Sequence, residues 1–312
     1  MGPGRRTQTG PVTALRPFAV VVTTAALGLL AGCGSAPATP PPAHPVAAHS
    51  TRPTKVLLVV EENHTQASAV RGMPYLAAMA RRYGHTTAHR AVAHPSLPNY
   101  LALAGGSTFG VRDDAGPASH RVGGPSVFDR VIAAHRTAKT YAEAMPAPCF
   151  RSATSRYGVK HNPWVYFADP GSRLNCRRFD VPAGTPARGP LRGDVNAGRL
   201  PDVGLLVPDT CDDAHDCSLA TADGGLRRGL PVVMAGPDYR RGRIAIVVTF
   251  DEDDTTGPNT VLTTVISPYT SHIVSSTPYT HYSLTRYLAE VTGTTPPGAA
   301  ATAPSLRAAF HL

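Results

Sequence analysis

The chain has 312 residues and a formal net charge of +9, and Arg5, Arg6 and Arg16 at the N-terminus supply three of the positive charges, which leaves 9 − 3 = +6. The other arginines are scattered, and aromatic residues make up 6% of the chain. Nucleic-acid binding is therefore not expected, because it usually requires a basic stripe with interleaved aromatic residues. A positive surface does favour anionic partners, including phosphorylated substrates.

The first 32 residues have the pattern of a lipoprotein signal peptide. They contain no acidic residue, and an apolar run from Phe18 to Ala31 leads to Leu30-Ala31-Gly32-Cys33. This run is shorter than the about 20 residues that a membrane span needs. We expect export and a lipid anchor on Cys33, which would hold the protein at the cell membrane, facing the extracytoplasmic side. A signal cleaved elsewhere, or a retained anchor helix, is the alternative and also implies export.

Residues 33–53 are rich in Pro and Ala and are predicted to form a tether, because such a segment buries too little apolar surface to fold. Residues 54–312 are long enough for one large α/β domain.

The elements of that domain follow from hydrophobic periodicity. The predicted order is strand 55–60, helix 73–83, strand 86–92, helix 97–105, helix 125–135, strand 137–141, strand 203–207, helix 218–235, strand 243–250, strand 260–267 and helix 281–292. Residues 142–200 are rich in Pro, Gly and Arg with little periodicity, which indicates an insertion or long loops. The alternation predicts an α/β fold, a three-layer α/β/α sandwich with a mainly parallel central sheet.

Four cysteines remain once Cys33 is set aside: Cys149, Cys176, Cys211 and Cys217. An even number in an exported domain indicates two disulfides. The short spacer makes Cys211–Cys217 the simplest closure and leaves Cys149 with Cys176. A zinc site is the alternative, but the spacings are not of the C-x-x-C type.

Two carboxylate clusters directly follow predicted strands. Glu62 and Asn63 come after strand 55–60, and Asp251 and Glu252 come after strand 243–250. Open α/β sheets carry their active sites at these strand ends, and an all-oxygen donor set suits a divalent cation. The alternative for residues 251–254 is a solvated acidic loop.

Ser96 precedes the predicted helix 97–105, where backbone N–H groups and the helix dipole favour a phosphate. A serine hydroxyl needs a base or a metal to become a nucleophile. This placement indicates attack on phosphorus, and a simple helix N-cap is the alternative. Imidazoles can also bind metal or stabilise phosphoryl charge, and the candidates are His64, His94, His161, His215 and His281. His85 and His89 are expected at the surface.

As a set, these stretches resemble the bacterial and fungal phosphoesterase family that contains acid phosphatases and phospholipases C, a branch of the alkaline-phosphatase-like fold. The matching stretches are Val60 to His64, His94 to Tyr100, Lys160 to Trp164, Pro208-Asp209 with Asp213 to Asp216, Thr249 to Glu252, and His281 to Leu284. They appear in family order and cover most of residues 55–292.

The resemblance implies that Glu62, Asn63, Ser96, Asp251 and Glu252 bind a divalent metal ion and that Ser96 is the nucleophile that becomes phosphorylated. It also implies that Asn99 contacts the phosphoryl group. His161, His215 and His281 would line the phosphate and leaving-group side, one of them acting as general acid.

The expected function is that of a metal-dependent, acid phosphatase-like phosphomonoesterase acting on a small phosphorylated substrate. Asp209 stands where relatives often carry Asn, and Glu252 is not followed by the His-Gly-Gly of the phospholipase-like members. The second departure disfavours the alternative of a phospholipase C-type phosphodiesterase. A lipid-anchored protein that binds phosphorylated ligands without turnover is the other alternative.

Overall fold

The central strand is β1 (Lys55–Glu61), a run of aliphatic residues that pairs in parallel with a strand on each side. The computed structural model describes residues 52–312, and within them eight strands form one sheet in the order β5-β4-β6-β1-β7-β8-β2-β9. Only β8 runs antiparallel to its neighbours in this described sheet. The bounds are β2 (Gly84–Thr86), β4 (Ala138–Ala142), β5 (Asp180–Pro182), β6 (Val203–Val207), β7 (Ile244–Phe250), β8 (Thr264–Ile266) and β9 (Ile273–Ser275).

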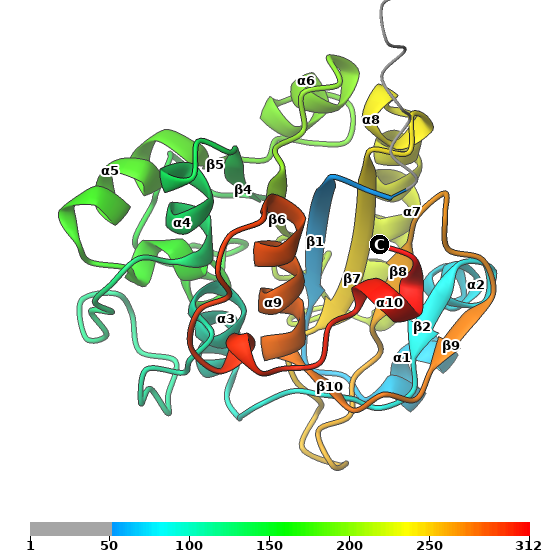
Figure 1. Ribbon diagram of the computed structural model, residues 1–312. Coiled ribbons are helices and arrows are strands. Elements are labelled where there is room, and N and C mark those ends of the chain that lie inside the picture. The colour runs from blue at the N-terminus through cyan, green and yellow to red at the C-terminus, as the bar shows by residue number, and fades with distance from the viewer. Residues whose placement is uncertain (1–51) are drawn as a thin grey trace, which may run out of the picture. The chain divides into compact units, whose positions relative to one another are not determined.

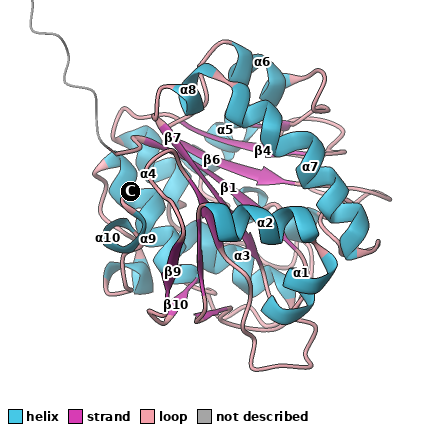
Figure 2. Cartoon of the chain, turned by 90° about the vertical axis from the view of Figure 1, so that its right-hand side faces the viewer, coloured by secondary structure: helices cyan, strands magenta, loops and turns pink. Residues whose placement is uncertain are grey.

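Helices cover both faces of this sheet, as the views in Figure 1 and Figure 2 show. The alternation of side chains along β1 explains the two layers. Val56, Leu58 and Val60 pack on one face, with residues of α3 (Ser96–Gly105), α4 (Val127–Ala133) and α9 (His281–Thr292). Leu57 and Val59 pack on the other face, with residues of α1 (Gln66–Gly72), α2 (Pro74–Arg82) and α7 (Leu219–Ala235). The predicted three-layer α/β/α architecture is confirmed.

Smaller elements complete the described chain. They are β3 (His89–Arg90), which pairs with β10 (Tyr279–Thr280), the helices α5 (Pro170–Phe179), α6 (Pro190–Asn196), α8 (Pro237–Arg240) and α10 (Arg307–Phe310), and the 3-10 turns at Val159–His161, Pro163–Tyr166 and Gly298–Ala301.

Two sequence-based expectations about these elements are wrong. Of the two alternatives for residues 142–200, an insertion or long loops, long loops alone is wrong, because these residues contain α5, α6 and β5, which extends the sheet by pairing with β4. These elements are too short for a periodic pattern to be visible. The predicted strand 86–92 is two short strands, β2 and β3, which belong to different sheets.

Both predicted disulfides are present, Cys149–Cys176 and Cys211–Cys217. Disulfides are typical of proteins of an oxidising, extracytoplasmic compartment. Among the described helices, none combines the length and the hydropathy that a membrane span requires. The predicted signal peptide at 1–32, the anchor on Cys33 and nearly all of the tether at 33–53 lie outside the described residues.

Candidate functional site

The two carboxylate clusters meet because β1 and β7 are parallel neighbours that end together, with Glu61 beside Phe250. The next residues are therefore adjacent, and the Asp251 backbone N–H donates to the Glu61 carbonyl at 2.9 Å. Asp251 Oδ1 in turn accepts a hydrogen bond from the Asn63 backbone N–H at 3.1 Å. The solvated-loop alternative is wrong for residues 251–253, because Asp251 and Asp253 are almost fully buried and Glu252 is only 6% exposed, whereas Asp254 is exposed.

Ser96 is the first residue of α3, and its hydroxyl points across the site to the end of β1. Ser96 Oγ donates to Glu62 Oε2 at 3.2 Å and accepts from Lys160 Nζ at 3.4 Å. The helix is preceded by Pro95 as its N-cap residue, and Ser96 makes no capping hydrogen bond. The N-cap interpretation of Ser96 therefore does not hold, and its hydroxyl lies between a carboxylate and an ammonium group.

Asp114 binds the N-terminal end of α3 and the Lys160 side chain. Its Oδ1 accepts from the Leu97 backbone N–H at 2.9 Å, and its Oδ2 accepts from Lys160 Nζ at 2.8 Å. Burial alone would lower the pKa of Lys160, but the ion pair with Asp114 outweighs it and raises this pKa. Lys160 therefore carries a positive charge beside Ser96.

Asn99 lies one turn along α3 and braces the segment before the helix. Its Oδ1 accepts from the backbone N–H groups of Val92 and Ala93, both at 3.0 Å. Its Nδ2 donates to Ala93 O at 2.9 Å and to Glu252 Oε2 at 3.1 Å. The buried amide thus ties the 92–95 segment to the end of β7.

Glu252 is held from two sides. Besides Asn99, His94 lies with Nδ1 at 3.1 Å from Glu252 Oε2 and with Nε2 at 3.3 Å from Asp253 Oδ1. These contacts orient the two acidic residues that follow Asp251.

His161 is fully buried between two carboxylates. Its Nε2 lies 3.3 Å from Glu62 Oε2 and its Nδ1 lies 3.2 Å from Asp213 Oδ2, while its ring stacks on Tyr100 at 5.3 Å. Neither ring nitrogen makes a well-directed hydrogen bond. Burial, which outweighs the opposing charge of Asp251, lowers the pKa of His161 to about 3. The ring is therefore neutral above that pH.

His215 lies on the same side of the site but is only half-buried. Its ring centroid is 5.3 Å from that of His161, and its Nδ1 lies 2.7 Å from Asp216 Oδ1. One ligand atom each from Glu62, His161 and His215 lies within 4.8 Å of the others, which is close enough to bind one ion.

His281, the first residue of α9, has its ring occupied by other contacts. Its Nε2 donates to the Asp251 backbone carbonyl, so its Nδ1 is the acceptor toward His89 Nε2 at 3.2 Å. Burial lowers the pKa of His281 to about 4. His89 is fully buried, so the expectation of a surface position is wrong for this residue. A two-residue strand offered no pattern that could have shown its burial.

Negative charge is concentrated in this buried site. Burial raises the pKa of Asp251 to about 6, of Asp213 to about 7 and of Glu252 to about 9. Burial, followed by the charges of Asp251 and Asp213, also raises the pKa of Glu62 well above its ordinary value. Such a cluster favours a cation, because the cation stabilises the ionised carboxylates.

Four site residues have no role assigned by the sequence motifs: Tyr100, Asp114, Lys160 and Asp213. Tyr100 donates to Glu62 Oε1. Tyr100, Lys160 and Asp213 do lie inside the matching stretches, which was the available signal. Asp114 lies in a loop with no pattern of its own.

The model of the Phosphoesterase family matches residues 67–294 of the chain. The chain belongs to the Phosphoesterase family. It is 29% identical over 258 residues to a phosphatidylinositol-3-phosphatase from Mycobacterium tuberculosis, covering 80% of this chain and 81% of that protein. It is also 29% identical to a phosphate-repressible acid phosphatase from Penicillium chrysogenum, covering 64% of this chain and 49% of the fungal protein. The chain thus spans about half the length of that fungal relative.

The fold also matches a protein in the alkaline phosphatase superfamily from Vibrio parahaemolyticus, with a TM-score of 0.52 at 8% identity over 83% of this chain and 72% of that chain. This similarity concerns the fold alone. Family and relatives together identify the protein as a hydrolase that acts on phosphoric ester bonds.

The buried carboxylates predict how stability depends on pH after chelation. Their pKa values are higher in the folded chain than in the unfolded chain, so their stabilising effect is complete below about pH 4 and is lost as the pH rises to the folded pKa, which is about 6 for Asp251, about 7 for Asp213 and about 9 for Glu252. Glu252 therefore dominates above about pH 7. His161 and His281 have lowered pKa values and act in the opposite direction only below about 6.5. Melting curves in chelator should therefore show Tm falling by about 5 °C or more between pH 6.5 and 9.

The variant Glu252→Gln should reduce this fall, because Glu252 has the folded pKa of about 9, whereas Asp202→Asn, which removes a carboxylate paired with Arg136, should not. A Tm that stays constant or rises over this range in the wild-type protein would contradict the assigned shifts.

Proposed function

We propose that the protein is a metal-dependent phosphomonoesterase in which Ser96 is the nucleophile and becomes transiently phosphorylated. The observation that carries this proposal is the position of Ser96 Oγ, held between Glu62 Oε2 and Lys160 Nζ at the first turn of α3. A serine used only for helix capping would direct its hydroxyl to the backbone.

The residues present fit a divalent cation. Buried atoms without a hydrogen-bond partner converge here: Asp251 Oδ2, Asp213 Oδ2 and both ring nitrogens of His161. Buried polar atoms normally have partners, so these lone pairs are suited to ligation. We propose Glu62, Asn63, Ser96, Asp251 and Glu252 as the ligand-bearing residues, with His161 adding an imidazole donor. A bound divalent ion would supply Lewis-acid stabilisation of phosphoryl charge and lower the pKa of a nearby hydroxyl.

In the first step, Ser96 Oγ forms a bond to phosphorus while the bond from phosphorus to the leaving oxygen breaks. Glu62 Oε2 is positioned to accept the Ser96 proton along their hydrogen bond. The Lys160 ammonium group, held by Asp114, stabilises the negative charge that develops on the phosphoryl oxygens.

His215 is the proposed general acid that protonates the departing oxygen. His161 is fully buried between two carboxylates, and His281 uses both ring nitrogens for other contacts. His215 is only half-buried and is oriented by Asp216. In the second step, a water oxygen forms a bond to phosphorus while the bond from phosphorus to Ser96 Oγ breaks. The His215 ring accepts the proton of the water, and Glu62 returns a proton to Ser96 Oγ, which releases phosphate and restores the site.

Asn99 and His281 act as positioning residues in this proposal. The Asn99 amide forms hydrogen bonds with the 92–95 segment and with Glu252, and the His281 ring donates a hydrogen bond to the Asp251 backbone carbonyl. Contact of Asn99 with the phosphoryl group stays a prediction.

Monoester hydrolysis is favoured over diester hydrolysis by the named relatives, two phosphatases, and by the missing His-Gly-Gly after Glu252.

We further propose that residues 1–32 are a signal peptide, that Cys33 carries a lipid anchor, and that residues 33–53 tether the catalytic domain 54–312 to the membrane. The two disulfides support an extracytoplasmic location.

The function is tested by measuring release of an aryl alcohol from phosphate monoesters and diesters, with chelator and with added divalent metals. Monoester turnover that chelator abolishes and metal restores is expected. Preference for the diester would favour the phospholipase C-type alternative. No turnover with any metal, in protein shown to be folded, would favour a non-catalytic phosphate-binding protein.

The role of Ser96 is tested by Ser96→Ala, which should reduce turnover by at least about 10³-fold. In serine proteases, removal of the nucleophilic hydroxyl lowers kcat by more than this. The matched control is Ser218→Ala, because Ser218 caps α7 by accepting from the Thr221 backbone N–H. The control should lose only about 0.5–2 kcal/mol of stability and keep its turnover. Full activity of Ser96→Ala would exclude Ser96 as the nucleophile.

A further inference from the structure

Glu61 is a buried carboxylate that the phosphoesterase site does not use. Consecutive residues of a strand point to opposite faces, so Glu62 reaches Ser96 whereas Glu61 lies on the α7 side with Leu57 and Val59. The Glu61 side chain is completely buried, and neither of its oxygens has a hydrogen-bond partner. A carboxylate buried in this way is costly unless a ligand compensates it.

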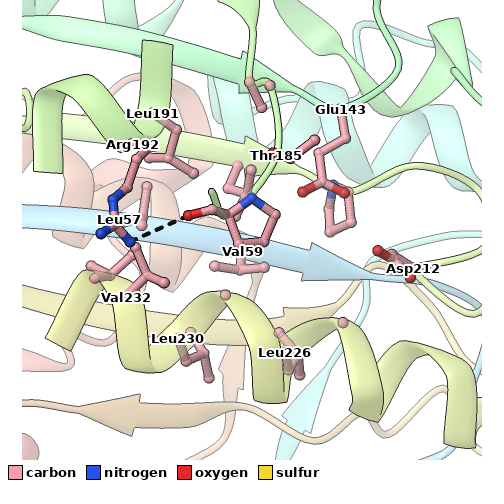
Figure 3. Close-up of a pocket in the computed structure, with 18 of the residues that line it drawn as sticks. Leu57, Val59, Glu143, Thr185, Leu191, Arg192, Asp212, Leu226, Leu230 and Val232 are labelled. Carbon is pink, nitrogen blue, oxygen red and sulfur yellow. Dashed lines mark hydrogen bonds between the residues drawn. The ribbon is translucent and has the colours of Figure 1, made fainter. Parts of the chain in front are cut away.

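Glu61 lines a cavity of about 50 Å³ between the sheet and α7. Figure 3 shows its apolar walls, with Leu57 and Val59 from β1 and Leu226 and Leu230 from α7. Glu143 and Asp212 lie together at the end of the cavity near the tip of β1 (Figure 3). A water molecule needs about 10–15 Å³ by this measure, so an ion with one or two waters fits.

Glu143 and Asp212 line this cavity together with Glu61, and Asp209 lies beside these two carboxylates. Glu143 follows β4, and Asp209 and Asp212 follow β6, and these strands lie side by side with β1 in the order β4-β6-β1. One oxygen each of Glu143, Asp209 and Asp212 lies within 4.8 Å of the others. Two ligands of one Ca²⁺ ion, each about 2.3–2.6 Å from the metal, have separations of up to about 5 Å.

The charges of this group are only partly compensated. Arg156 pairs with Asp209, and Arg228 donates to both oxygens of Asp212 at 3.1 Å. Within residues 52–312, Glu61 and Glu143 have no ion-pair partner. Four carboxylates and two guanidinium groups leave 4 − 2 = 2 negative charges when all are ionised, which matches one divalent cation.

A glycine of helix α7, Gly225, leaves space for the side chain of Asp212. A Cβ at Gly225 would lie 3.1 Å from Asp212 Cγ, so any larger residue would press on the carboxylate. Gly225 also lines the cavity.

We infer that Glu143, Asp209 and Asp212 bind one Ca²⁺ ion on the face of the sheet opposite Ser96, and that the unpartnered carboxylate of Glu61 faces this ion through the cavity. An all-oxygen set of irregular geometry suits Ca²⁺ better than Mg²⁺, which requires a near-ideal octahedron. The ion would fix the segment 208–217, which is closed by Cys211–Cys217 and presents Asp213 and His215 to the phosphoesterase site. The Ca²⁺ site would thus hold Asp213 and His215 in place for the phosphoesterase site on the other face of the sheet.

The test measures Ca²⁺ binding by equilibrium dialysis of the full chain after chelation, in an Asp251→Asn background that removes a ligand of the phosphoesterase site. This protein should bind one Ca²⁺ per chain, and Tm should rise by about 5–10 °C at a hundredfold excess over Kd. Adding Glu143→Gln or Asp212→Asn should abolish both effects, and neither residue is fully buried, which favours folding of the variants. Adding Asp202→Asn, whose carboxylate pairs with Arg136, should leave both effects intact.

The proposal is overturned if folded Asp251→Asn protein binds no Ca²⁺, or if binding survives both Glu143→Gln and Asp212→Asn. Neither result depends on phosphatase turnover, so this site and the phosphoesterase site are tested separately.

Discussion

Carboxylates buried at the carboxyl ends of β1, β6 and β7 are the constraint on which the rest of the site depends. Parallel strands that end together bring Glu62, Asp213 and Asp251 into one volume from which water is excluded. Desolvation raises the pKa of all three, and the charges of Asp251 and Asp213 raise that of Glu62 further, so the chain must either hold protons there or bind a cation. The hydrogen bonds from Tyr100 and from the Asn63 backbone reduce this cost but do not remove it.

Helix α3 places a hydroxyl group and an ammonium group against this cluster of carboxylates. Its first residue, Ser96, faces the carboxylates, while Asp114 satisfies the following backbone N–H and holds Lys160 beside the hydroxyl. The buried amide of Asn99 fixes the helix to Glu252 and to the segment before it. Ser96 and the first turn of α3 are thus held by contacts from separate parts of the chain, and such preorganisation is what the proposed phosphoryl transfer requires.

The sequence was sufficient for the architecture because long aliphatic strands such as β1 and β7 leave a clear pattern, and because strand ends in an α/β sheet are where sites form. The sequence was insufficient for elements and residue roles that depend on contacts between segments far apart in the chain. The short elements between residues 142 and 200 have no periodicity of their own, and β5 exists because β4 offers it an edge. The roles of Lys160, Asp114 and His89 depend on side-chain contacts between distant segments, which no local pattern encodes.

The central claim is that Ser96 carries the phosphoryl group during turnover. The most direct measurement is to mix metal-loaded protein with excess aryl phosphate, quench in acid within the first turnovers, and map phosphorylated peptides by mass spectrometry. The account predicts one phosphorylated site, Ser96, in the peptide that contains Pro95 and Leu97, and its disappearance when substrate is exhausted. Turnover without phosphorylation of Ser96, under conditions in which a matched phosphoserine protein survives the quench, would contradict the account and indicate direct attack by water.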